Sequence, residues 1–158
     1  MERASEDISS LLRAARACRV CAEVLPHGPN PVLRAGPAAR LLIVGQAPGW
    51  KVHTTGIPWN DPSGERLRAW MDVDRETFYD TSRIAIAPIA FCYPGKDARG
   101  GDRPPRPECA PLWHPRLLAA LPRLEMILLV GQHAQGYHLG RARKRTLTET
   151  GRAYRAYL

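Results

Sequence analysis

The chain has 158 residues, of which 44% are hydrophobic, and this is enough for one domain with a sizeable core. No apolar run approaches the roughly 20 residues of a membrane-spanning helix, so we expect no membrane span. The net charge of +8 favours a polyanionic partner such as nucleic acid, although many small proteins without such a partner are also basic. Residues 1–7 (MERASED) are acidic where an export signal would be basic, which predicts a cytoplasmic protein.

The predicted elements alternate between helices and strands. In chain order they are a helix over residues 5–17, a Pro- and Gly-rich loop over 26–39, a strand over 40–45, a helix over 63–71, a turn over 77–80, a strand over 83–87, a Pro-rich loop over 88–107, a helix over 107–121, a strand over 126–130 and a helix over 132–139. Ser5 and Ser63 are the expected N-caps of the first two helices, and Leu67 and Trp70 are expected to face inward.

This alternation predicts an α/β fold, namely a three-layer α/β/α sandwich with a mainly parallel central sheet. Three strands are few for such a sheet. We therefore expect either that a further strand lies within a loop or that the polypeptide stops early. Residues 1–158 are interpreted as a single domain.

A ligand loop follows the first strand. Residues 41–49 (LLIVGQAPG) are an apolar strand that ends in a Gly-rich turn, and residues 56–64 (GIPWNDPSG) present an aromatic ring, an amide and a carboxylate before a helix. In parallel sheets, ligands bind at the carboxyl ends of the strands. Trp59 can stack on a flat polar ring, Gln46 or Asn60 can hydrogen-bond to it, and Asp61 can handle a proton or a cation.

Four cysteines form two separated pairs. Cys18 and Cys21 have C-x2-C spacing, and Cys92 and Cys109 bracket the Pro-rich loop. Four thiols in two pairs suggest tetrahedral ligation of zinc or of an iron–sulfur cluster, and a cytoplasmic location disfavours structural disulfides. Because C-x2-C is common, four unrelated buried thiols remain the alternative. A metal would tie the long loop to the N-terminal helix.

Basic residues gather in two parts of the chain. Residues 141–158 have a net charge of +5, and the Pro-rich loop has several cations that nearby acidic residues nearly cancel. The candidate DNA contacts are Arg99, Arg103, Arg106, Arg143, Lys144 and Arg145. The alternative for the C-terminal group is a solvated terminal helix with a basic face.

Several of these segments resemble the uracil-DNA glycosylase superfamily. Residues 45–49 (GQAPG), followed by Gly56-x-Pro58-Trp59, resemble its first motif, and residues 128–134 (LLVGQHA) resemble its later strand and helix start. The two cysteine pairs resemble the four ligands of its iron–sulfur branches, families 4 and 5, in which the second pair also encloses a Pro-rich loop. The resemblance covers about residues 18–140.

The chain departs from the family pattern at three places. Gln46 stands where one four-cysteine branch has Glu, and the loop with Asp61 looks more like the other branch, whose substrate range is broad. Pro88 stands where the family often has an Asn that reads the uracil edge. The second motif, of His-Pro-Ser type, does not follow Gly140, so the chain is expected to be truncated before that motif or to have lost it.

The resemblance implies a monomeric DNA repair glycosylase with a 4Fe-4S cluster, or zinc, on the four cysteines. Its substrate would be DNA containing uracil or another deaminated base such as hypoxanthine. Asp61 would orient water and steady the sugar cation, the backbone amides of Gln46 and Ala47 would meet a pyrimidine carbonyl, and Trp59 would stack on the flipped base, with Asn60 beside it.

Simpler roles remain open for these residues. Asp61 can act as an N-terminal residue of the following helix, Gln46 as a turn residue, and Trp59 as a core residue. For the whole chain, the alternatives are a non-catalytic DNA-binding or damage-recognition module of the same fold, and a zinc-bound small-molecule α/β protein.

Overall fold

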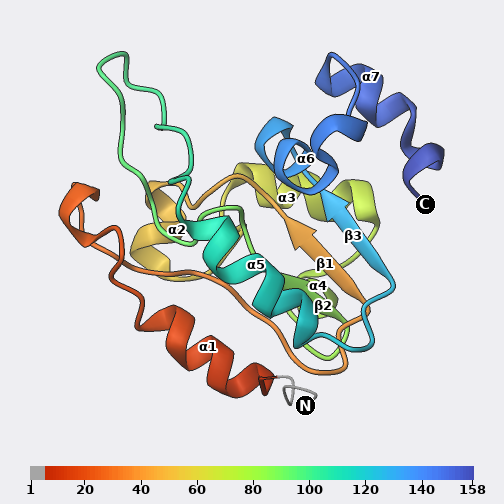
Figure 1. Cartoon of the computed structure of the whole chain (residues 1–158), viewed down its shortest axis with the longest axis horizontal. Coiled ribbons are helices and arrows are strands. Elements are labelled where there is room, and N and C mark those ends of the chain that lie inside the picture. Colours follow the sequence, from red (N-terminus) through yellow and green to blue (C-terminus); the bar gives the residue numbers. More distant parts are fainter. Residues whose placement is uncertain (1–5) are drawn as a thin grey trace.

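A parallel sheet of three strands forms the centre of the computed structural model, which describes residues 6–158 (Figure 1). The strands are β1 (Leu41–Val44), β2 (Ile84–Ile86) and β3 (Met126–Leu129). Their order is β2-β1-β3, and β1 pairs in parallel with both neighbours, so that Leu42 lies opposite Ala85 and Ile127. The predicted parallel sheet is confirmed.

Helices cover both faces of the sheet (Figure 1). One face packs against α1 (Ile8–Arg16), α5 (Cys109–Ala119) and α6 (Gln132–Leu139), and the other against α3 (Pro62–Met71) and α4 (Arg75–Phe78). Because side chains alternate along a strand, Leu42 and Val44 enter the first core and Ile43 enters the second. The predicted α/β sandwich is therefore the observed fold.

The loop over residues 26–39 contributes one further pairing to the sheet. Arg34 forms an isolated antiparallel bridge with Ile86 of β2, with N–H···O distances of 2.9 and 2.7 Å in the two directions. Nearby, the amide of Val32 donates to the carbonyl of Phe91. The described residues thus contain no fourth strand, and the loop adds a single bridge on the outer edge of β2.

The helix starts differ from the predictions by a few residues. The N-cap of α1 is Asp7, whose carboxylate accepts from the amide of Ser10, and the expected cap Ser5 lies outside the described residues. The N-cap of α3 is Asp61 rather than Ser63, because Pro62 is suited to the first helical position. Leu67 is buried as predicted, but Trp70 is 77% exposed, so the prediction that it faces inward was wrong.

Short helical segments complete the structure. A helix that the sequence did not predict, α2 (Trp50–Thr55), ends at Gly56 in the left-handed conformation, and the predicted turn near residue 77 is α4. The 3-10 helices are η1 (Ala22–Val24), η2 (Gly140–Ala142) and η3 (Tyr154–Tyr157), and α7 (Leu147–Arg152) precedes η3. Among residues 6–158, no helix is long and apolar enough to cross a membrane.

Candidate functional site

A cleft of about 410 Å³ opens at the carboxyl ends of the three strands. Residues 45–49 line it after β1, Pro88 after β2, and Val130 and Gly131 after β3. The strand ends therefore supply the floor, which is the expected position of a ligand site in an open parallel sheet. Trp59 and Asp61, from the loop before α3, form part of its wall.

Trp59 lies so close to the backbone that two glycines are needed around it. A Cβ at Gly45 would lie 2.9 Å from Cζ2 of the indole, and a Cβ at Gly64 would lie 1.7 Å from the carbonyl oxygen of Trp59. Trp59 also has a φ of +57°, which is uncommon for a bulky residue. The loop thus has a specific conformation that presses the indole against the end of β1.

A buried arginine holds this loop in place. Arg68 of α3 donates from Nη1 to the carbonyl oxygen of Trp59 at 3.0 Å, and the hydroxyl of Tyr79 donates to the carbonyl oxygen of Pro58 at 2.6 Å. The guanidinium of Arg68 also lies over the ring of Phe78, at 5.1 Å from its centroid. These bonds fix two successive carbonyls, which offsets the strain at Trp59.

The structure places Asp61 both at the N-terminus of α3 and in the cleft. Its Oδ1 accepts from the amide of Gly64 at 2.8 Å, so the capping role weighed from the sequence is present. The side chain is half-buried and also lines the cleft. One carboxylate oxygen therefore has a structural partner, while the residue still faces the ligand space.

The other predicted base contacts lie in different positions. Gln46 and Ala47 line the cleft, and among the described residues no protein atom accepts from their backbone amides. Asn60 does not line the cleft: its amide donates to Thr55 and its carbonyl accepts from Arg75, both at 3.4 Å. Asn60 thus has partners within the loop, and its contact with a base stays a prediction.

Pro88 lines the cleft, and its side chain has no hydrogen-bonding group. Its carbonyl oxygen lies 2.9 Å from Nε2 of His114, a buried residue of α5. Nδ1 of His114 lies 3.0 Å from Nε2 of His138 in α6, and burial lowers the pKa of both imidazoles, that of His138 to about 4. Sequence reasoning missed this histidine pair, because residues 24 positions apart on two helices show no local pattern.

Asp102 is a second carboxylate in the cleft, and the sequence did not single it out. It comes from the loop over residues 92–109, which extends away from the sheet in Figure 1. Within the described chain, Asp61 and Asp102 are the only charged residues that line the cleft. Acidic and basic residues alternate along this loop, so the sequence did not indicate which of its acidic residues would line the cleft.

The four cysteines line one common cavity on another part of the molecule. Cys18, Cys21, Cys92 and Cys109 come together there with apolar neighbours such as Leu25 and Leu112. Burial raises the pKa of the Cys92 thiol to about 11 and that of Cys109 to about 12. The structure therefore brings together the two pairs that the sequence places far apart.

The four cysteines match a thiolate-bound group in donor type alone. Four thiols are the ligand set of structural zinc and of iron–sulfur clusters. The indole N–H of Trp113, which lines the same cavity, is buried and has no partner among the described residues. However, no three Cys, His, Asp or Glu side chains of residues 6–158 are arranged to hold one metal ion together.

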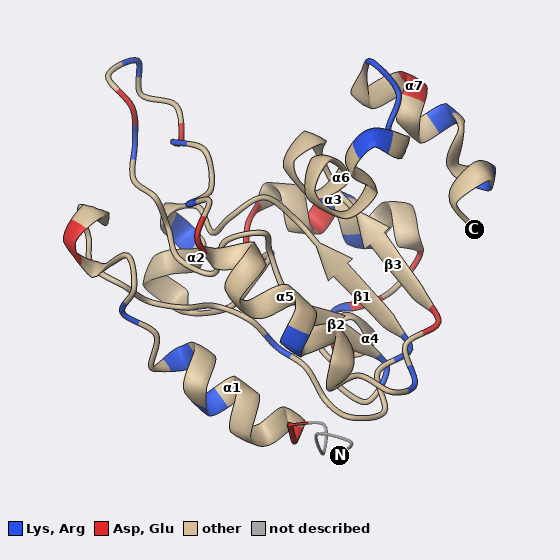
Figure 2. Cartoon of the chain, in the orientation of Figure 1, with Lys and Arg blue, Asp and Glu red and all other residues tan. Residues whose placement is uncertain are grey.

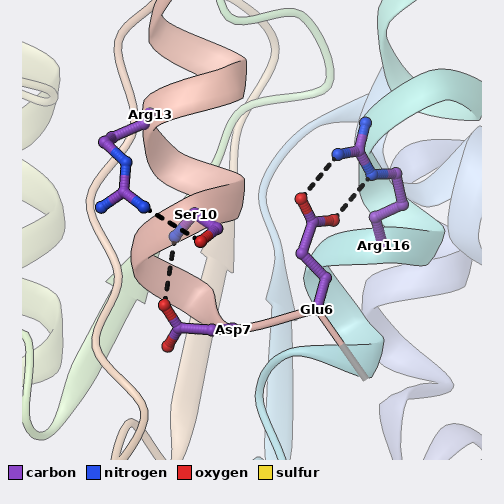
Figure 3. A network of polar contacts seen from close by, with 5 residues as sticks. All are labelled: Glu6, Asp7, Ser10, Arg13 and Arg116. Carbon is purple, nitrogen blue, oxygen red and sulfur yellow. Dashed lines mark hydrogen bonds and ion pairs between the residues drawn. The ribbon is translucent and has the colours of Figure 1, made fainter. Parts of the chain in front are cut away.

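An ion pair joins the segment before α1 to α5. Figure 3 shows Glu6, just before α1, in a two-pronged contact with Arg116 of α5, at 2.8 and 3.0 Å. The Arg116 guanidinium also lies 4.5 Å from the ring centroid of Trp113. The contact joins the start of α1 to α5, whereas Cys18 follows the other end of α1.

The candidate DNA contacts occupy two projecting regions (Figure 2). Arg99 and Arg103 are exposed on the long loop, whereas Arg106 is paired with Glu108 at 2.6 Å beside the cysteine cavity. In the C-terminal region, the exposed residues Arg143, Lys144 and Arg145 follow α6. Arg106 thus differs from the other candidates in having an ion-pair partner.

A protein-family model matches most of the chain. The family described as "Uracil DNA glycosylase superfamily" matches residues 34–157, which is more than three quarters of the chain. The matched segment includes all three strands, the loop with Trp59 and Asp61, and the loop with Asp102. Cys18 and Cys21 precede it.

Proposed function

Since the chain belongs to the uracil-DNA glycosylase superfamily, whose members are DNA glycosylases, we propose that it excises uracil, and other deaminated bases such as hypoxanthine, from DNA. The observation that carries this proposal is the cleft of about 410 Å³ at the strand ends, with Trp59 as one wall. Its size suits a single base, and a base must leave the helical stack before an enzyme can attack its sugar bond.

Base recognition is assigned mainly to the end of β1. The amides of Gln46 and Ala47 line the cleft and are available to a carbonyl of the flipped base, and the exposed Gln46 side chain can add a hydrogen bond. Trp59 supplies an aromatic face for stacking. Pro88 offers no side-chain hydrogen bond, so backbone contacts would read the base, which favours a broad range of deaminated bases.

Asp61 is the proposed catalytic carboxylate. As the C1′–N bond breaks, positive charge develops on the sugar and negative charge on the leaving base. Oδ1 of Asp61 accepts from Gly64, which leaves Oδ2 to orient water and to steady the sugar cation. The free amides of Gln46 and Ala47 stabilise the negative charge on the base oxygen.

We assign Cys18, Cys21, Cys92 and Cys109 to a 4Fe-4S cluster, with zinc as the alternative. The group would supply a cross-link between chain segments and no step of the hydrolysis. It would anchor both ends of the loop over 92–109, which holds Arg99 and Arg103 at the surface. These cations, with Arg143, Lys144 and Arg145, are the proposed phosphate contacts of a cytoplasmic monomer.

A second candidate function is a DNA-binding module without catalysis. The observation that favours it is the N-cap bond of Asp61, which gives this carboxylate a sufficient structural role. Both candidates predict DNA affinity that falls as salt concentration rises, because each phosphate contact releases counterions.

The deciding experiment incubates the purified chain with single- and double-stranded oligonucleotides that contain uracil or hypoxanthine. Alkali-labile abasic product supports the glycosylase. Salt-sensitive binding without product supports the module instead, and an absorption band near 400 nm or its absence distinguishes an iron–sulfur cluster from zinc.

A further inference from the structure

The cleft has the opposite charge to the protein as a whole. The chain has a net charge of +8, yet within the described residues the only charged residues lining the cleft are Asp61 and Asp102. The two carboxylates disfavour a phosphate beside them in the cleft. They suit a group that becomes positive, which in glycosidic cleavage is the sugar.

A small hairpin holds Asp102 at this position. Lys96 and Asp102 form an antiparallel bridge, and the flanking bonds join the amide of Asp97 to the Gly101 carbonyl at 2.8 Å and the amide of Arg103 to the Gly95 carbonyl at 2.9 Å. These backbone bonds set the position of the Asp102 backbone, and its side chain is 45% exposed.

The two oxygens of Asp102 face different neighbours. Oδ1 lies 3.7 Å from the ammonium of Lys96, and Oδ2 lies 3.7 Å from the position that a Cβ of Gly49 would occupy, on the cleft wall. The Lys96 ammonium reduces the repulsion between this carboxylate and DNA phosphates. Oδ2 remains available on the side of the cleft.

Asp61 has one carboxylate oxygen, Oδ1, that accepts from the amide of Gly64, so Oδ2 is the oxygen left for a ligand. Hydrolysis of a glycosidic bond commonly uses two carboxylates on opposite sides of the reacting carbon. Asp102, from a loop remote in sequence from Asp61, is the one further acid that lines the cleft among residues 6–158.

We propose that Asp102 is a second catalytic residue, whose carboxylate faces the deoxyribose and stabilises its positive charge during cleavage. The inference rests on the proposed glycosylase function. In the reaction the C1′–N bond breaks and its electron pair leaves with the base, water adds its oxygen to C1′, and the proton that water releases is balanced by the proton that the base takes up. Asp102 is not consumed.

Binding of two abasic-site mimics tests this role. Duplexes carry either a cationic pyrrolidine in place of the deoxyribose or its neutral tetrahydrofuran counterpart, and the readout is the ratio of the two dissociation constants. We expect the protein to prefer the cationic duplex, and Asp102→Asn to reduce that preference about tenfold, which corresponds to about 1.4 kcal/mol.

Asp97→Asn is the matched control, because it removes the same charge from the same loop. Asp97 does not line the cleft, and its Oδ1 accepts from the amides of Arg99 and Gly101, which an Asn oxygen can also do. This variant should retain the preference for the cationic duplex. If the loop charge acted in a general way, Asp102→Asn and Asp97→Asn would reduce the preference for the cationic duplex equally.

The outcomes separate this inference from the proposed function. An unchanged preference in Asp102→Asn, or no preference in the unmodified protein, overturns the role of Asp102. Product formation from uracil-containing DNA is scored separately: a cation preference that depends on Asp102 without any product supports Asp102 facing the sugar and refutes the glycosylase.

Discussion

The cleft and the cysteine cavity differ in what holds them together. The cleft wall is fixed by contacts within the chain: Arg68 and Tyr79 bind two carbonyls of the loop, and Gly45 and Gly64 leave room for Trp59. The cysteine cavity is enclosed by two segments far apart in sequence, and its four cysteines are free, with no disulfide in the described chain. The cleft wall is thus held by several hydrogen bonds and close packing, whereas the thiols have only weak protein contacts, such as Cys21 Sγ at 3.7 Å from Glu108 and Cys109 Sγ at 3.3 Å from the amide of Phe91.

This contrast predicts the largest effect at the cysteines. Cys92→Ser should abolish the visible absorption and the bound metal, and should lower the free energy of unfolding by about 3 kcal/mol or more, since binding energy in such sites is folding energy. Metal analysis and urea unfolding measure both quantities. Val20→Ala, a change at an exposed residue of the same cavity, should retain the metal. Equal stability of Cys92→Ser and the unmodified protein would show that the cavity needs no ligand.

At the cleft, the free energy of unfolding should instead depend on the space around Trp59. In Gly64→Ala the new methyl would overlap the carbonyl oxygen of Trp59, so the loop must move and its bond to Arg68 must break. We expect a loss of about 3 kcal/mol, at the upper end of overpacking effects. The control is Gly151→Ala in α7, where the methyl meets nothing within 4 Å and should stabilise the helix by about 0.5–1 kcal/mol. Similar unfolding curves for the two variants would contradict this packing argument.

Charge and capping at Asp61 can be separated by two substitutions. Asp61→Asn retains an N-cap of similar strength, so unfolding should change by less than about 0.5 kcal/mol. Loss of the negative charge should slow excision about 100-fold, or about 2.7 kcal/mol in the barrier. Asp61→Ala should show the same slow excision and lose about 1 kcal/mol of stability as well. If Asp61→Asn cleaves at the normal rate, the residue serves only as a cap.

The cleft was more predictable from sequence than its details were. The apolar run of β1, the Gly-rich turn and the loop with Trp59 are consecutive, so local patterns indicated a ligand site at the end of a strand. The inward turn of Asp102 depends on a hairpin pairing that no local pattern encodes. The absence of Asn60 from the cleft lining was equally unpredictable, because its partners, Thr55 and Arg75, come from separate helices.

Helix faces show the same limit. Leu67 and Trp70 are three residues apart on α3, which predicted a shared buried face, yet the core reaches Leu67 and stops before Trp70. The buried position next to Leu67 is occupied by Arg68, because its guanidinium is needed by the Trp59 carbonyl. A tertiary hydrogen bond therefore overrides the hydrophobic pattern at this site.

The smallest expected effect concerns the histidine pair that connects the two regions through α5. The Pro88 carbonyl can only accept, so Nε2 of His114 donates to it, and Nδ1 of His114 must accept from His138. A proton added to either ring disrupts this chain, in agreement with the lowered pKa of His114 and the pKa of about 4 for His138.

The folded state holds both imidazoles neutral. The contribution of the histidine pair to the free energy of unfolding is therefore present above about pH 6.5 and is lost as the pH falls toward 4. For the half-buried His138 we expect a contribution of about 1 kcal/mol, reduced from the full shift by solvent screening. Urea unfolding at pH 7.5 and pH 5 measures it. His138→Gln should make the unfolding free energy less dependent on pH over this interval. If the unfolding free energy of His138→Gln falls as steeply between pH 7.5 and pH 5 as that of the unmodified protein, the histidine pair is not the source of the pH dependence.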